Sequence, residues 1–272
     1  MATLPFPCTA TPLTQDGIQS AMTALGIDAA TLWAMLHVET KGCGYFGSRR
    51  PQILFERHLF SRHTHGAFDA TAPDVSNPVA GGYGAGGDFQ YNRLGKAFSL
   101  DPSAQDAALE SASWGLGQVL GSNAVSVGFT DVQDMVAAMA ASEDRQLQAV
   151  VGYILANKLQ HALQTQNWAA YAAGYNGPDY AKYHYDTNLA QAYALYQNAS
   201  RLPDLTIRAG QLTLFLLGFN PNGIDGVLGA GTLTALHNFQ SQQQLPLTTG
   251  IDADVLSALT AALPPATDLS LT

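Results

Sequence analysis

A single carboxylate completes the apolar face of a predicted helix near the N-terminus. Within "LWAMLHVE" (residues 32–39), apolar side chains occupy positions i, i+3 and i+4, and Glu39 occupies position i+7. Burial disfavours the charged form of a carboxyl group and raises its pKa. A carboxylic acid that stays protonated near neutral pH can protonate the leaving oxygen of a glycosidic bond. Glu39 is therefore our candidate general acid, with an ion pair to Lys41 or Arg49 as the alternative.

The common mechanisms of glycoside hydrolysis use a second carboxylate. Glu56, in "ILFERH", follows a short apolar run and is the nearest candidate. An ion pair with Arg57 or another nearby arginine would explain this glutamate equally well. Asp69, Asp74 and Asp88 lie in a glycine-rich segment, where turn and capping roles are the more typical use of aspartate.

Polar and aromatic side chains close to glycines are the candidates for binding a sugar. Glycine lets a ligand approach the backbone closely, and amide and hydroxyl groups bond to sugar hydroxyls and N-acetyl groups. Tyrosine adds a flat apolar face on which a pyranose ring can lie. The candidates lie in "SWGLGQ" (113–118), in "GYNGP" (174–178) and in the glycine-rich segment 66–92: Gln118, Tyr175, Asn176, Tyr83 and Tyr91.

Helices must position these residues. The chain is predicted to be mostly α-helical, with a small strand or extended segment at Ile53–Phe55. Asp28 is a predicted N-cap, and Asp101 with Pro102 is typical of a helix start. The expected helices cover about residues 14–25, 29–39, 102–113, 131–143, 145–163, 166–174, 184–198, 207–217, 230–243 and 252–262, and the tail 264–272 is expected to fray.

The segment "SRLPDL" (200–205) is a plausible linker between two domains. We predict a larger domain over residues 1–200 and a smaller three-helix domain over residues 203–265. The formal net charge is −9 with no run of Lys or Arg, so neither nucleic acid nor an anionic membrane is an expected partner. No apolar stretch is long enough to span a membrane, and no secretory signal is recognisable. Cys8 and Cys43 are expected to be free thiols.

Five separated segments together resemble a known superfamily. They are "LWAMLHVETKGCGYF", "RPQILFERHLF", "SASWGLGQVLG", "SEDRQLQAVVGYI" and "WAAYAAGYNGPDYAKYHYDTNLAQAY", and they span about residues 10–198. In this order they resemble the lysozyme-like superfamily, and most closely the N-acetylmuramidase domain of phage endolysins. The resemblance implies a lysozyme-like helical catalytic domain with a sugar-binding cleft, with Glu39 in the place of the catalytic acid. It also implies a second carboxylate at Glu56 and cleft positions for Gln118, Tyr175 and Asn176.

The C-terminal segment "DGVLGAGTLTALHNFQ" (225–240) resembles the core of the three-helix peptidoglycan-binding domain of cell-wall hydrolases. The residues at that family's spacing are Asp225, Gly226, Gly229, Thr232, Ala235, Phe239 and Gln240. The two glycines are expected to form a turn, and Leu233, Leu236 and Phe239 the apolar face of a helix. The basic residue usual just before the threonine is absent, and Ala230 and Gly231 stand there.

The resemblance implies a peptidoglycan hydrolase of the endolysin kind, which cleaves the β-1,4 bond between N-acetylmuramic acid and N-acetylglucosamine. Its expected partner is the peptidoglycan glycan strand, and we expect a monomer without a cofactor. Without a signal peptide, we expect synthesis in the host cytoplasm and action on the cell wall after membrane permeabilisation. A lytic transglycosylase, which leaves a 1,6-anhydro end and needs no second carboxylate, stays open as an alternative.

Three further interpretations compete with this one. A zinc enzyme would use His58, His63 and His65, but no ligand motif accompanies them, and we expect no metal. A nucleophile at Cys43 would follow a helix end, whereas an activated thiol prefers a helix N-terminus or a neighbouring cation. A non-catalytic wall-binding virion protein would keep the C-terminal domain but would have no need of Glu39.

Overall fold

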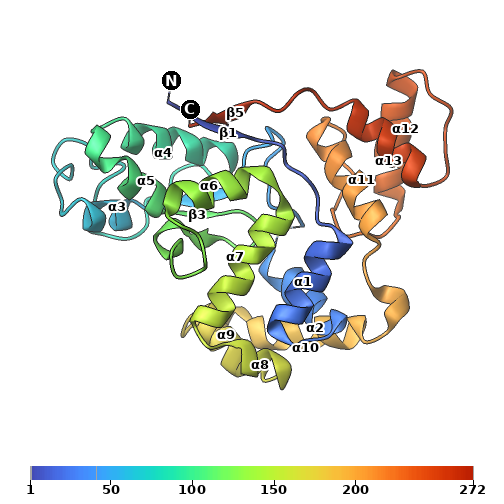
Figure 1. Cartoon of the computed structure of the whole chain (residues 1–272), viewed down its shortest axis with the longest axis horizontal. Helices are drawn as coiled ribbons and strands as arrows, with labels where there is room; N and C mark the ends of the chain where they lie inside the picture. The colour runs from blue at the N-terminus through green and yellow to red at the C-terminus, as the bar shows by residue number, and fades with distance from the viewer. Residues whose placement is uncertain (1, 41, 272) are drawn as a thin grey trace. The chain divides into compact units, whose positions relative to one another are not determined.

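The computed structural model describes residues 2–40 and 42–271, and helices dominate it (Figure 1). The helices of the N-terminal half are α1 (Gln15–Leu25), α2 (Ala29–Glu39), α3 (Arg57–His63), α4 (Gln90–Phe98), α5 (Gln105–Glu110), α6 (Val132–Ala141) and α7 (Glu143–Ala156). Those that follow are α8 (Gln160–Gln164), α9 (Trp168–Tyr175), α10 (Tyr185–Tyr196), α11 (Leu205–Leu216), α12 (Ala230–Gln242) and α13 (Ala253–Ala261). The strands are β1 (Thr3–Pro7), β2 (Ile53–Phe55), β3 (Ala112–Trp114), β4 (Val119–Leu120) and β5 (Asp268–Ser270). The prediction of a mostly helical chain with a small β segment is confirmed.

The first two helices begin and end at the residues that the sequence indicates. The Thr14 side chain accepts a hydrogen bond from the Gly17 N–H at the start of α1. Gly26 ends α1 in the left-handed conformation that glycine adopts without strain. The Asp28 carboxylate then accepts from the Thr31 N–H at 2.8 Å, which confirms the predicted N-cap of α2.

A three-stranded antiparallel sheet forms where one helix was expected to continue. Its strand order is β2-β3-β4, with Ile53 opposite Trp114, so the predicted strand at Ile53–Phe55 is confirmed. The helix expected up to Ser113 is wrong at its C-terminal end, because α5 stops at Glu110 and β3 begins at Ala112. Trp114 is buried, and its indole N–H donates to the Leu109 carbonyl at 3.0 Å. The buried ring thus fixes the change from helix to strand.

The C-terminal tail does not fray. Residues 268–270 form β5, which pairs antiparallel with β1 at the other end of the chain (Figure 1). Leu269 and Leu271 have no exposed surface, so burial of two apolar side chains opposes fraying. The Leu271 N–H also donates to the Ala2 carbonyl at 3.0 Å. Consequently, α11, α12 and α13 are connected at one end to α10 and at the other end to a strand that pairs with the N-terminus.

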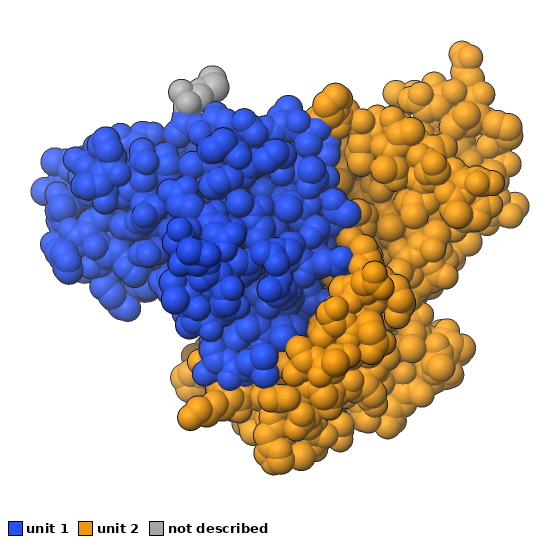
Figure 2. All heavy atoms as spheres, viewed as in Figure 1, with its two compact units in different colours: residues 1–11, 44–156, 266–272 blue, residues 12–43, 157–265 orange. Residues whose placement is uncertain are grey.

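The chain divides into two compact units, which Figure 2 shows in different colours. The first comprises residues 1–11, 44–156 and 266–272, and the second comprises residues 12–43 and 157–265. The helix expected over 145–163 is interrupted at the boundary, because α7 ends at Ala156 and Lys158 has a φ of 58°.

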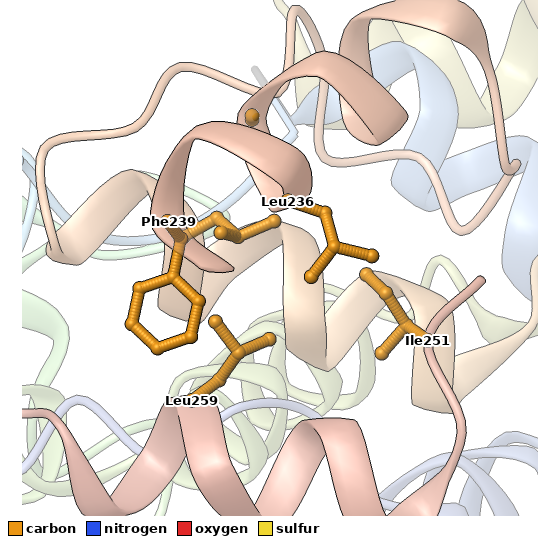
Figure 3. Packing of buried hydrophobic residues seen from close by; sticks show 6 residues of the cluster. Leu236, Phe239, Ile251 and Leu259 are labelled. Atoms are coloured by element: carbon orange, nitrogen blue, oxygen red, sulfur yellow. The ribbon is translucent and has the colours of Figure 1, made fainter. Parts of the chain in front are cut away.

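Helices α11, α12 and α13 share a hydrophobic cluster within the second unit. Figure 3 shows Leu236 and Phe239 of α12 pointing toward Leu259 of α13 and toward Ile251. The aromatic rings of Phe219 and Phe239 meet edge to face, with centroids 5.7 Å apart. Leu233, which was expected on this face, is only half-buried and lies outside the cluster, while Thr232 on the same helix is buried.

The buried Thr232 belongs to a polar network around Gln211 of α11. The Gln211 Nε2 group donates to Asp225 Oδ1, to the Val227 carbonyl and to Thr232 Oγ1 at 2.9 to 3.0 Å. Its Oε1 atom accepts from the backbone N–H groups of Asp225 and Gly226. One buried amide therefore supplies the hydrogen-bond partner for the backbone N–H groups of the Asp-Gly turn. The hydrogen bond from Gln211 also gives a structural role to Thr232, which stands seven positions after Asp225.

Gly226 and Gly231 have no room for a side chain. Gly226 has a φ of 73°, and a Cβ there would lie 2.7 Å from Pro203 Cβ. A Cβ at Gly231 would lie 2.7 Å from both Asn222 Cβ and the Pro221 carbonyl oxygen. The tight approach of residues 221–222 thus leaves no room at position 231 for the larger basic side chain that the resemblance leads one to expect.

Cys8 and Cys43 are both buried, and neither forms a disulfide among the described residues, which confirms the prediction of two thiols. Among the described residues, no single helix is long and apolar enough to cross a membrane. Helices α1 and α2 meet that length and composition only when taken together, and they are bent by 104° at their junction.

Candidate active site

Glu39 is the last residue of α2, a helix buried on nearly all sides. Every residue from Ala30 to Leu36 is buried, so the apolar character of α2 extends beyond the single face that the spacing predicted. Helix α10 packs along α2, and α9 packs on α10 in turn. After Glu39 the chain leaves the helix, since Thr40 is extended. The buried Arg208 of α11 donates to the Gly42 carbonyl at 2.7 Å and so holds the segment that follows.

The Glu39 carboxyl group is half-buried, and among the described residues its side-chain partner is Asn176. The Asn176 Nδ2 group donates to Glu39 Oε2 at 2.8 Å. Glu39 Oε1 is inaccessible to solvent and has no hydrogen-bond partner among the described residues. Burial raises the pKa of Glu39 from 4.5 to about 7, and the hydrogen bond from Asn176 opposes part of that increase. Glu39 therefore keeps a proton near neutral pH, as a general acid must.

Asn176 and Tyr175 come from the end of α9. Asn176 is the C-cap of that helix, and Gly177 turns the chain away with a φ of 86°. The Tyr175 ring stacks on the buried Tyr171 ring, with centroids 5.4 Å apart and planes 23° apart. Tyr175 is half-buried, so part of its surface is open to a ligand. The predicted "GYNG" segment thus brings an amide into contact with Glu39 and places a tyrosine beside that amide.

Glu56 lies in the first unit at the junction of β2 and α3. Its backbone N–H donates to the Ser111 carbonyl at 2.9 Å, and its side chain makes no capping bond to α3. Glu56 Oε2 lies 3.4 Å from His58 Nδ1, and both side chains are one-fifth exposed. The pKa of Tyr83 is raised by burial and then by the charge and hydrogen bond of Glu56. Glu56, His58 and Tyr83 therefore form one polar cluster.

The Glu56 carboxylate contacts His58 and not Arg57, the ion-pair partner that was the alternative to a catalytic role. The Arg57 guanidinium instead lies against Gly82, where an added Cβ would be 2.6 Å from Arg57 Cζ. Tyr83 follows this glycine and is 39% exposed, so its ring remains accessible beside the carboxylate. The role of His58 was missed from the sequence, although its Glu-x-His spacing in "ERH" was a signal for it.

Gln118 and Tyr91 have structural partners that limit their role in binding. Gln118 has a φ of 51° and donates from Nε2 to the carbonyls of Gln52 and Gly115, so its amide nitrogen holds the β3–β4 turn. Its side chain is nevertheless exposed, and a binding role stays a prediction. Tyr91 has no exposed surface and donates to the Pro51 carbonyl at 2.9 Å. The prediction that Tyr91 binds substrate is wrong, because a fully buried ring cannot contact a glycan.

The weaker carboxylate candidates bond to side chains, in place of the turn and capping roles expected of them. Asp69 accepts hydrogen bonds from the hydroxyls of Ser61 and Ser76. Asp74 pairs with Lys96, and Asp88 pairs with Arg50. Lys41, one suggested partner of Glu39, lies outside the described residues.

Two buried polar side chains that sequence reasoning missed hold the loops of the first unit. Glu143 Oε1 accepts from the Gly44 N–H at 3.1 Å. Gln146 Oε1 accepts from the Leu116 N–H at 2.8 Å, and its Nε2 donates to the Met139 carbonyl. The contacts with Gly44 and Leu116 join residues 99 and 30 positions apart, so no local pattern could indicate them.

A carboxyl group at a helix end whose pKa is raised by burial has the property that the general acid of a glycosidase needs, and it lies here on a mostly helical fold. The N-acetylmuramidase family matches residues 28–197, and the chain belongs to that family. Residues 204–259 match a peptidoglycan-binding domain. A search of curated protein sequences finds no significant match.

Among solved structures, the crystal structure of a Burkholderia AP3 phage endolysin is similar. The two chains are 38% identical, with a TM-score of 0.64, and the match covers 69% of this chain and 72% of that one. Together with the family match, this likeness supports the interpretation as an endolysin. The protein is thus a lysozyme-type peptidoglycan hydrolase that cleaves the β-1,4 bond between N-acetylmuramic acid and N-acetylglucosamine, and its partner is peptidoglycan.

Proposed function

We propose that Glu39 is the general acid of this reaction and that Glu56 is the second carboxylate. The observation that carries the first role is the half-buried Glu39 carboxyl, whose pKa is raised to about 7 and whose Oε2 is held by Asn176. The raised pKa keeps a proton on the Glu39 carboxyl group. Glu39 donates this proton to the glycosidic oxygen as the bond from that oxygen to the anomeric carbon breaks.

Water completes the reaction at the anomeric carbon. Its hydroxyl adds to the N-acetylmuramic acid residue, and its remaining proton passes to a carboxylate, so the products are two free sugar ends. Glu56 either accepts that proton or stabilises positive charge at the anomeric centre. Its closeness to the Tyr83 hydroxyl and to His58 supports a functional role, because a side chain that only filled space would not need two polar neighbours.

The products distinguish a hydrolase from a lytic transglycosylase. Purified peptidoglycan is digested with the protein, and the released muropeptides are analysed by mass spectrometry before and after borohydride reduction. We expect reducible N-acetylmuramic acid ends. Ends that resist reduction and are lighter by one water would instead identify the transglycosylase reaction.

The role of Glu56 is tested with Glu56→Gln. We expect lower turnover with an unchanged melting temperature. Glu110→Gln is the matched control, because Glu110 also lies beside a histidine, 3.7 Å from His63, but has no proposed role. Equal activity of the two variants would remove Glu56 from the mechanism.

We further propose that Tyr83, Tyr175 and Gln118 contact the glycan. Tyr83 has accessible ring surface next to Glu56. Tyr175 is half-buried and lies next to Asn176, the partner of Glu39. We propose that the protein acts as a monomer, is made in the host cytoplasm and reaches the wall after membrane permeabilisation. Light scattering during size-exclusion chromatography tests the oligomeric state, and lysis that requires co-expression of a membrane-permeabilising protein tests the route.

A further inference from the structure

A groove on the exposed side of α2 and α10 contains none of the residues assigned above. It has a volume of about 500 Å³, within the usual range of roughly 300–1,000 Å³ for ligand sites. Helix α2 contributes His37, the 3-10 helix η4 (Tyr180–Tyr183) contributes Tyr183, and α10 contributes Tyr185, Asn188, Gln191 and Leu195. Glu39, Asn176 and Tyr175 do not line it.

The local backbone brings these side chains to one surface. Tyr185, Asn188 and Gln191 follow one another at intervals of three, so they lie along one stripe of α10. His184 has a φ of 60°, a left-handed conformation that turns the chain sharply between Tyr183 and α10. The turn places a tyrosine from η4 on the same groove as the stripe from the helix.

The chemistry of the groove suits a neutral saccharide. Two phenol rings offer flat apolar faces with a polar edge, and two side-chain amides offer both donors and acceptors. None of the lining residues is Asp, Glu, Lys or Arg, so the groove has no fixed formal charge with which to select an ionic ligand. An N-acetylated pyranose has a ring face that can pack on the phenol rings, and it has hydroxyls and an amide that can bond to the side-chain amides.

Two side chains of the groove are held in place from outside it. His37 Nδ1 lies 3.0 Å from the Tyr196 hydroxyl, and the two rings meet edge to face. The Lys182 ammonium lies 5.3 Å from the centroid of the Tyr183 ring. Tyr183 nevertheless keeps 58% of its surface exposed and Leu195 keeps 43%. The groove is thus accessible and partly pre-organised, which lowers the entropy cost of binding.

We propose that this groove is a second glycan-binding site, which holds N-acetylated sugar units of the strand away from the bond that is cleaved. The choice of a glycan as the ligand rests on the proposed function. The presence of a binding groove rests on its lining residues alone. His37 is two residues from Glu39 on the same helix, so the site moves with the general acid. A strand bound there stays close to the catalytic residue between turnovers, which raises its effective concentration.

Binding is measured by NMR titration of the full-length Glu39→Gln protein with chitotetraose, a soluble oligomer of N-acetylglucosamine. We expect shift changes at the amides of residues 183–195. Tyr183→Ala should weaken binding about 3- to 10-fold, as expected for the loss of an aromatic contact, and Tyr183→Phe should restore it. Shift changes confined to residues 174–177, or equal affinity for Tyr183→Ala, would overturn the proposal.

Turnover provides an independent readout in the protein with Glu39 intact. Gln191→Ala should raise KM for polymeric peptidoglycan about 3-fold or more while kcat stays unchanged. Gln197→Ala is the control, because Gln197 is exposed at the C-terminal end of the same helix and does not line the groove. An unchanged KM for Gln191→Ala would overturn the proposal, whereas a failure of the proposed function would appear in the cleavage products instead.

Discussion

Asn176 and Glu39 are 137 positions apart in the sequence, yet the Asn176 amide donates to the Glu39 carboxyl group at 2.8 Å. The contact joins the ends of α9 and α2, and α10 packs against both helices. A neutral hydrogen-bond donor beside a buried carboxyl group fixes the orientation of that group without forcing it to ionise. This arrangement keeps Glu39 both oriented and protonated.

Glu39→Gln should abolish most of the lytic activity. A general acid contributes about 10²- to 10⁴-fold to the rate, and glutamine cannot supply a proton. The variant should fold normally, because its amide oxygen can still accept from Asn176. Turbidity loss of purified cell walls measures the activity, and circular dichroism measures the fold. Full activity of the variant on stripped walls would favour the non-catalytic wall-binding alternative.

Asn176→Ala should move the alkaline limb of the pH–activity profile upward. The hydrogen bond from Asn176 lowers the pKa of Glu39, so its loss raises that pKa above about 7 and keeps the acid protonated to higher pH. At the same time kcat should fall, because the carboxyl group loses its orientation. The profile of kcat/KM between pH 5 and about 9 measures both effects. A limb that stays in place or moves to lower pH would contradict this assignment.

The raised pKa of Glu39 also makes the stability of the protein depend on pH. The folded state holds the proton more tightly than the unfolded state, whose carboxyl pKa is the ordinary 4.5. The contribution to the free energy of unfolding is therefore fully present below pH 4.5 and is lost as pH rises through about 7. The slope is at most about 1.4 kcal/mol per pH unit. Denaturant unfolding at several pH values measures the free energy of unfolding of the wild type and of Glu39→Gln. The difference between the two proteins should change between pH 4.5 and about 7 and stay constant at higher pH.

Gly44→Ala should destabilise the first unit by about 1–3 kcal/mol, the usual cost of overpacking. A Cβ at Gly44 would overlap Gln146 Oε1, and moving that atom away would break its hydrogen bond from the Leu116 N–H. Gly86→Ala is the control, since a Cβ there meets no atom within 4 Å and its φ of −80° is ordinary. Thermal melting compares the two variants, and equal melting temperatures would show that the Gln146 contacts are dispensable.

Gln211→Leu should destabilise the three-helix domain and weaken its binding to cell walls. The substitution leaves the N–H groups of Asp225 and Gly226 without their buried acceptor, at a cost of about 1–3 kcal/mol. Gln242→Leu, at an exposed position of α12, is the matched control. Co-sedimentation with purified walls and chemical denaturation measure the two effects. Wall binding equal to that of the control would mean that the Asp-Gly turn does not shape the binding surface.

The sequence predicted those parts of the fold that local patterns determine. Caps such as Asp28 and the apolar spacing before Glu39 gave the correct ends of α2, because both signals lie within one or two helical turns. The strand β5 could not be predicted, since its stability comes from pairing with residues more than 250 positions away. The motif "GYNG" indicated a site, but only the fold shows that Asn176 bonds to Glu39.

The same limit applies to the site residues. Tyr91 lies in a segment rich in glycine, which suggested a surface loop, yet its ring is buried beside Trp114 and under Arg50. The sequence presents His58 only as one of three clustered histidines, because spacing does not show that it lies 3.4 Å from Glu56. Residue type indicated the chemistry in each case, whereas burial decided which side chains can reach a substrate.

The pairing of β1 with β5 has a consequence for how the protein survives proteases in a lysed cell. A single cut in the segment around residues 197–204 would break the covalent link between the N-acetylmuramidase domain and the peptidoglycan-binding domain. The C-terminal fragment would still carry β5, with Leu269 and Leu271 buried against the N-terminal part of the chain. A nicked molecule would therefore remain associated as a two-fragment complex and keep its wall-binding domain, and two cuts would be needed to release it.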